Sequence, residues 1–174
     1  MQKNTYLQDE NYLGIITELL ENEDVKQLVQ YTHHKYTNRL EHSLTVSYNS
    51  YKWAKRFNLD AEAVAKAGLL HDLFFTMMCD ANTKREHLRL HPEVSLVNAR
   101  KVCTLTSLEE DIILSHMFLV SFKHIPKYRE SFLVSMIDKT TAIQEVIFLP
   151  IKVNYHKVRK QPVYVTETSP QSNK

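Results

Sequence analysis

Six side chains of the types that bind metal ions recur along the chain at similar intervals. They are four histidines and two aspartates: His42, His71, Asp72, His91, His116 and Asp138. The gaps between them, apart from the adjacent pair, are 29, 19, 25 and 22 residues, and each suits one helix plus one loop. We therefore expect successive ligands to come from successive helices and to meet at one interior point. Imidazoles combined with carboxylates suit a divalent transition metal (iron, manganese, zinc or nickel) and would be unusual for calcium.

The two aspartates stand among apolar residues. Asp72 precedes Leu-Phe-Phe, and Asp138 follows Val-Ser-Met-Ile. Burial of a bare carboxylate is so costly that each needs an ion pair, a hydrogen bond or a metal. A metal shared with the histidines would satisfy both. The structural alternatives are a buried hydrogen-bonded His71–Asp72 pair and an ion pair between Asp138 and Lys139 or an arginine.

The other three histidines among the candidate ligands also have structural interpretations. His42 could be a core histidine whose hydrogen bonds are satisfied. His91 directly precedes an expected helix and could be only its cap. His116 could be a surface residue near a helix C-terminus, where a positive charge is favourable. If either His91 or His116 has only this structural role, the site holds one metal rather than two.

Hydrophobic spacing predicts that these residues lie on helices, because apolar side chains recur every three to four residues. The expected fold is all-α, a bundle of about six or seven helices. The expected helices span Asp9–Glu21, Asp24–Tyr31, Asn38–Phe57, Asp60–Asp72, Pro92–Val102, Ser107–His116 and Glu130–Phe148.

Local signals predict where several of these helices begin. Asp60 can cap its helix. Pro92 fits the first position of the next helix, where its missing N–H costs nothing. Ser107 and Glu110 have the spacing of a capping box.

Three stretches are expected to lie outside the helices. Residues 31–37 and 123–127 are predicted loops, the first with the alternative of a frayed helix end, and 76–90 is a predicted polar loop with short helical turns. In the last helix, an apolar side facing the core is expected, formed by Phe132, Leu133, Met136, Ile137 and Ile143.

The chain is expected to form one helical domain, residues 1–150, followed by a short irregular tail, 151–174. The first part holds 17 basic and 19 acidic residues, and the tail holds five basic residues and one acidic residue. The tail has a weak strand-like alternation up to residue 165 and is predicted to be disordered after it. Because the body carries no excess of basic residues, a nucleic-acid partner is not expected.

Composition excludes several other classes. Gly14 and Gly68 are the only glycines, whereas a dinucleotide or phosphate-binding loop needs clustered glycines. Two cysteines, Cys79 and Cys103, make no disulfide framework. The first residues lack the apolar stretch of a secretory signal, and no run has the ~18 apolar residues of a membrane span. We expect a cytoplasmic protein with no membrane partner.

The spaced ligands and their neighbours resemble the signature of the HD-domain superfamily of metal-dependent phosphohydrolases. The matching strings are Arg39-Leu-Glu-His42-Ser, Gly68-Leu-Leu-His71-Asp72, His91-Pro92 and Asp138-Lys139. The resemblance covers about residues 36–147. His91 and His116 match the additional histidines of the subgroup that holds two metals.

The resemblance implies a ligand set and a reaction. His42, His71, Asp72 and Asp138 would hold one metal, and Asp72 would bridge to a second metal held by His91 and His116. A metal-bound hydroxide would attack phosphorus in a phosphoester or phosphoanhydride of a small nucleotide-like substrate. One or two ions of unknown identity are thus expected, and the oligomeric state stays open, with a homodimer among the alternatives.

The resemblance also suggests residues that contact substrate. Arg39 lies one helical turn before His42 and matches an arginine that contacts phosphate in some HD nucleotidases; the structural alternative is a surface residue in a salt bridge. Lys139 follows a ligand, and both residues are expected to have catalytic and substrate-binding roles beside Asp72. His87 and Arg89 precede His91 where a substrate lid could lie.

The match to known subgroups is incomplete, and this leaves the substrate open. Leu73-Phe74-Phe75 follows His-Asp where dinucleotide and cyclic-dinucleotide hydrolases usually carry a lysine. Nucleoside-monophosphate hydrolases usually carry a glutamate where Phe75 stands. Two alternatives to a phosphohydrolase remain: an HD-fold di-iron oxygenase with the same six ligands, and a non-catalytic nucleotide sensor stabilised by its metal.

Overall fold

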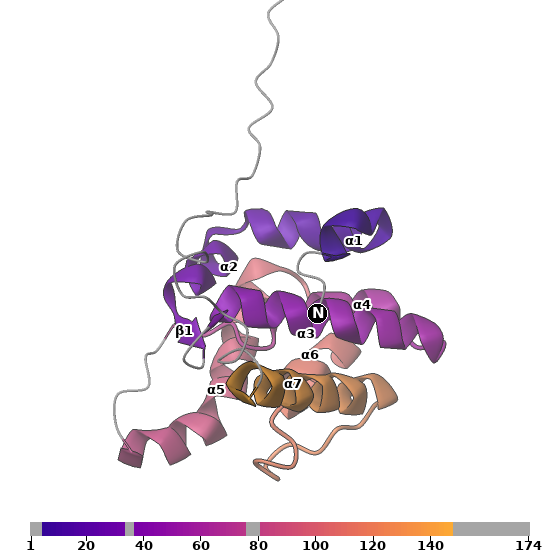
Figure 1. Ribbon diagram of the computed structural model, residues 1–174. Helices are drawn as coiled ribbons and strands as arrows, with labels where there is room; N and C mark the ends of the chain where they lie inside the picture. The colour runs from indigo at the N-terminus through magenta and orange to yellow at the C-terminus, as the bar shows by residue number, and fades with distance from the viewer. Residues whose placement is uncertain (1–4, 34–36, 76–80, 148–174) are drawn as a thin grey trace, which may run out of the picture.

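The computed structural model describes residues 5–33, 37–75 and 81–147, with the backbone alone at 5, 33 and 81–88 (Figure 1). The described chain is all-α apart from one minimal hairpin, as predicted. Its α-helices are α1 (Glu10–Glu21), α2 (Glu23–Gln27), α3 (Arg39–Arg56), α4 (Ala61–Leu70), α5 (Ala81–Val102), α6 (Ser107–Ser115) and α7 (Arg129–Ile147). Two 3₁₀ turns, Thr5–Gln8 and Leu28–Gln30, flank the first pair of helices.

Side-chain caps determine where the first helices begin. Asp9, Asn38 and Asp60 each accept a hydrogen bond from a backbone N–H in the first turn of α1, α3 and α4. α3 ends where Asn58 takes a positive φ of 52°, and the Leu59 N–H returns to the Ala54 carbonyl at 2.9 Å. This is the left-handed helix ending in which asparagine commonly replaces glycine. The side-chain caps therefore confirm the predicted starts of α1, α3 and α4.

α3 and α4 form the centre of the molecule and pack closely. A Cβ on Gly68 would lie 3.0 Å from the Cα of Ser47, so a larger residue there would push α3 and α4 apart by a few tenths of an ångström. The Ser47 hydroxyl donates to the Ala65 carbonyl at 2.7 Å and accepts from Tyr12 at 2.8 Å, which ties α1 to the same point. In Figure 1, α1 lies above α3 and α4, and α6 and α7 lie below them.

Two local predictions need correction. The predicted loop at 31–37 instead contains β1 (Thr32–His33) paired antiparallel with β2 (Thr37–Asn38). The capping box of α6 lies one residue earlier than predicted. Thr106 caps the helix and Glu109 reaches back to the Thr106 N–H at 2.7 Å. The sequence offers two overlapping candidates with the same spacing, and only the one whose first residue is extended can form the box.

The prediction that a helix begins at Pro92 is wrong. α5 starts at Ala81, so residues 81–90 are helical and Pro92 lies inside the helix. An internal proline costs about 3 kcal/mol. The burial of His91, Leu96 and Ala99 against the core opposes this cost. The first part of α5 points away from the bundle in Figure 1, as expected for a helix that bends at proline.

The predicted apolar side of α7 is only partly correct, because Leu133 and Ile137 pack against the core but two other members do not. Phe132 and Ile143 are 50% and 55% exposed. The buried side chains are mostly polar: Ser131, Val134, Ser135, Asp138, Thr141 and Glu145. The helix turns this face inward because its polar groups meet partners there, for example the Ser131 hydroxyl on Asp111 at 2.7 Å.

The predicted tail and Cys79 lie outside the described residues. Cys103 is a free thiol, as expected. In the part of the chain that the structure describes, no helix combines the length and apolarity of a membrane span.

Candidate metal centre

His71 follows the last residue of α4 and turns its imidazole into the protein. Its Nδ1–H donates to the Gly68 carbonyl three residues earlier at 2.8 Å, which directs Nε2 inward. The ring is fully buried. Its Nε2 makes no hydrogen bond within the described chain, although Asp138 Oδ1 lies 3.7 Å away and Asp72 Oδ1 4.0 Å away. This buried nitrogen thus faces two carboxylates but hydrogen-bonds neither of them. A cation bound between the three groups would give each of them a partner.

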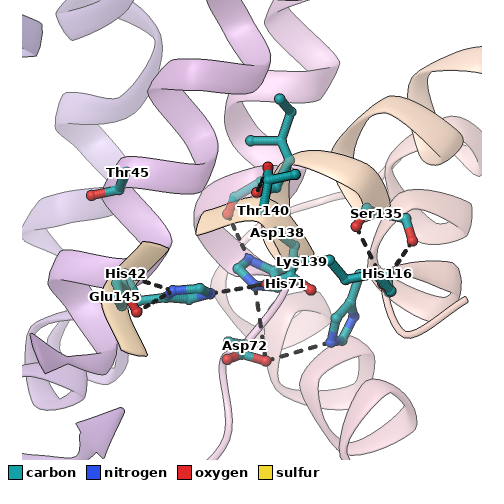
Figure 2. Close-up of polar contacts among 12 residues, drawn as sticks. His42, Thr45, His71, Asp72, His116, Ser135, Asp138, Lys139, Thr140 and Glu145 are labelled. Atoms are coloured by element: carbon teal, nitrogen blue, oxygen red, sulfur yellow. Dashed lines mark hydrogen bonds and ion pairs between the residues drawn. The ribbon is translucent and has the colours of Figure 1, made fainter. Parts of the chain in front are cut away.

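His42 lies on α3 between two carboxylates of α7. Its Nε2 is 3.0 Å from Asp138 Oδ1, and its Nδ1 is 3.1 Å from Glu145 Oε2 (Figure 2). Burial opposes protonation of this ring, but the two carboxylates outweigh burial and raise its pKa to about 10. Burial likewise works against ionisation of Asp138, yet His42 and His71 hold the pKa of this carboxyl well below its usual value.

Glu145 is the residue that sequence reasoning missed. It is 6% exposed and also accepts a hydrogen bond from the Thr37 hydroxyl at 3.2 Å. A signal was present, because Glu145 lies two helical turns after Asp138 and so on the same face of α7. A carboxylate on the outer nitrogen of a ligating histidine fixes the ring and makes it more basic.

His91 and His116 form a second group around Asp72. Their Nε2 atoms are 2.8 Å apart, and each lies 3.5 Å from Asp72 Oδ1. The Nδ1–H of His116 donates to the Ile113 carbonyl at 2.7 Å. His71 makes the equivalent bond to the carbonyl three residues before it. His91 is buried within α5, so the interpretation of this residue as a helix cap is wrong, and His116 is buried rather than on the surface.

Two groups with the geometry to hold a metal ion thus share Asp72. One is His42, His71 and Asp72, and the other is Asp72, His91 and His116; within each, the candidate ligand atoms lie within 4.8 Å of one another. Asp138 joins the first group through His42. Ligands about 2.0–2.2 Å from a common ion lie at most about 4.4 Å apart, so the observed nitrogen–oxygen distances of 3.0–4.0 Å fit divalent ions.

The predicted substrate cations have other partners in the protein. Lys139 Nζ donates to the His116 carbonyl at 2.6 Å and to the Ser135 hydroxyl at 2.9 Å. Figure 2 shows it beside His116 at the end of α6, where a cation is favourable. Burial lowers its pKa. Arg39 is buried, and its Nη1 donates to the Phe74 carbonyl.

The two predicted lid residues lie in the first part of α5. Arg89 is exposed to solvent, and His87 is one helical turn before His91, with its side chain outside the described atoms. Contact of these residues, Arg39 or Lys139 with substrate stays a prediction.

Comparison with known proteins identifies the family but no individual relative. The model of the HD domain matches residues 39–143, more than half of the chain and the whole span from α3 to Asp138. No curated protein and no solved structure matches the chain. The matched span and the buried histidine–aspartate cluster place the chain in the HD domain family.

Proposed function

We propose that the protein is a metal-dependent phosphohydrolase that cleaves a phosphoester or phosphoanhydride bond of a small nucleotide-like substrate. The observation that supports this most strongly is the pair of buried ligand groups joined by Asp72. The family is one of metal-dependent phosphohydrolases in general, and the donor set here suits iron, manganese, zinc or nickel.

Each residue of the centre has a distinct part in the proposal. His42, His71 and Asp138 hold one ion with Asp72, and His91 and His116 hold the other with the same carboxylate. A divalent ion bound there lowers the pKa of its water toward neutrality and stabilises charge on phosphoryl oxygens. The backbone carbonyls of Gly68 and Ile113 keep Nε2 of His71 and His116 free for the ions by accepting from Nδ1.

The decisive experiment compares Asp72→Asn with the unmodified protein. Because Asp72 is shared, we expect this variant to lose most bound metal, measured by elemental analysis. We also expect phosphate release from a panel of nucleotides and cyclic dinucleotides to fall below detection. Glu62→Gln is the control, since Glu62 is exposed and pairs with Lys66 outside the metal centre. Normal turnover by metal-depleted Asp72→Asn protein would refute the proposal.

The same samples separate the rival functions. Bound iron with oxygen uptake would identify an oxygenase. Tight nucleotide binding without phosphate release, tested with several metals, would identify a sensor.

A further inference from the structure

Arg39, the first residue of α3, is held by the segment that follows Asp72. Its side chain is 3% exposed. Its Nη1 donates to the Phe74 carbonyl, and the guanidinium carbon lies 3.6 Å from the centroid of the Phe74 ring. On another side, the Tyr31 ring centroid is 5.4 Å away. The guanidinium thus contacts both the backbone and the ring of one residue.

This residue, Phe74, is in turn connected to both ligand groups. Its N–H donates to the Asp72 carbonyl at 2.8 Å, and its ring centroid lies 5.1 Å from the His91 ring. The preceding carbonyl, that of Leu73, accepts from Asn98 Nδ2 of α5 at 3.0 Å. The turn after α4 is therefore held from α3 by Arg39 and from α5 by Asn98.

The chemistry of the guanidinium suits this task. Buried carbonyls outside a helix need donors, and Arg39 and Asn98 supply them to two successive residues. Guanidinium is planar, so it stacks on an aromatic ring while its edge donates, whereas the ammonium of lysine cannot do both.

We propose that Arg39 is a positioning residue of the metal centre. It holds Phe74, and through Phe74 it keeps Asp72 and His91 in the arrangement that the second ion needs. The inference rests on the proposed function and gives Arg39 a role other than direct contact with substrate phosphate. The ion of the first group should depend less on Arg39, because His42 is held by Asp138 and Glu145 of α7.

The test uses the full chain with Arg39→Met, Arg39→Lys and the control Arg100→Met, whose arginine is exposed and pairs with Glu110. Calorimetric titration with Mn²⁺ measures both ions, and hydrogen exchange of the metal-free protein measures the amides of residues 71–75. For Arg39→Met we expect faster exchange in this segment and about 10–100-fold weaker binding of the second ion. Binding of the first ion should change much less. Arg39→Lys should change in the same direction by less, and it replaces Arg39→Met if that variant does not fold.

A role on substrate phosphate predicts a different result. Both Mn²⁺ affinities and the exchange of 71–75 would then match Arg100→Met, and only KM for a hydrolysed nucleotide would rise. This outcome would overturn the inference and leave the proposed function standing. Failure of the unmodified protein to bind any Mn²⁺ or other divalent ion would instead contradict the proposed function, and the inference with it.

Discussion

The two ligand groups that meet at Asp72 differ in their charge and in the elements that support them. The first group draws on α3, α4 and α7, with Asp138 beside His42 and Glu145 behind it. The second draws on α5 and α6, and both of its histidines lie 3.5 Å from the Asp72 carboxylate. The outer ring nitrogen of His116, Nδ1, donates to a backbone carbonyl rather than to a carboxylate.

This difference in charge bears on how strongly each group can bind. A divalent ion in the first group would face Asp72 and Asp138. Glu145 adds further negative charge on the other side of the His42 ring. An ion in the second group would share Asp72 and otherwise meet the imidazoles of His91 and His116. Charge neutralisation favours the first position, so the second ion should bind more weakly and gain most from the phosphate of a substrate.

The largest expected effect comes from removing one histidine from each group. His42→Ala should abolish tight binding of the first ion, because it also leaves Asp138 and Glu145 without their shared partner. His116→Ala should leave one tightly bound ion and remove the second. Elemental analysis after dialysis, combined with Mn²⁺ titration, measures both.

The control is His124→Ala, whose histidine pairs with Glu93 outside the centre. Equal loss of metal from His42→Ala and His116→Ala would show that the two groups bind metal as one unit, and it would contradict the predicted difference in affinity between them.

A smaller effect is expected at Glu145, because it acts through His42. Glu145→Leu removes the acceptor of the outer nitrogen and should weaken the first ion by about 10–100-fold, as changes behind a ligating histidine commonly do. Glu145→Gln keeps a hydrogen-bond acceptor without the charge and should lose less. Competition with a chelator measures both.

Glu130→Gln is the matched control on the same helix, since Glu130 accepts from the Asp60 N–H outside the metal centre. If Glu145→Leu and Glu130→Gln retain the ion equally well, Glu145 contributes nothing to the first position.

The sequence predicted most reliably what depends on neighbouring residues. The caps Asp9, Asn38 and Asp60 act within one helical turn, so the starts of α1, α3 and α4 could be identified. The convergence of the six candidate ligands could also be predicted, because the gaps between them repeat the length of one helix plus one loop.

Features that depend on distant partners were missed. The hydrophobic period of α7 predicts only part of its buried face: Leu133 and Ile137 pack against the core, but Glu145 is buried through His42, which lies 103 residues earlier in the chain. Pro92 suggests a helix start, and only packing of α5 against the core keeps the helix continuous through it. The hydrogen bonds of Lys139 to the His116 carbonyl and the Ser135 hydroxyl were not foreseen either, because the first of them joins two helices.

The smallest expected effect is at Lys139, and it is on stability. Lys139→Met keeps the aliphatic stem but removes the donor to the His116 carbonyl, which then retains the Ser135 hydroxyl at 2.9 Å. The variant loses the ammonium's hydrogen bonds to the His116 carbonyl and to Ser135 but no longer buries a charge, so the net cost should be about 1 kcal/mol, or about 2–4 °C in Tm. Thermal denaturation of the metal-free protein measures this, with Lys66→Met as control, since Lys66 is half-buried and pairs with the exposed Glu62. An unchanged Tm with a raised KM for nucleotide would mean instead that Lys139 leaves this carbonyl to contact substrate phosphate, and the second group would then have a cation of its own.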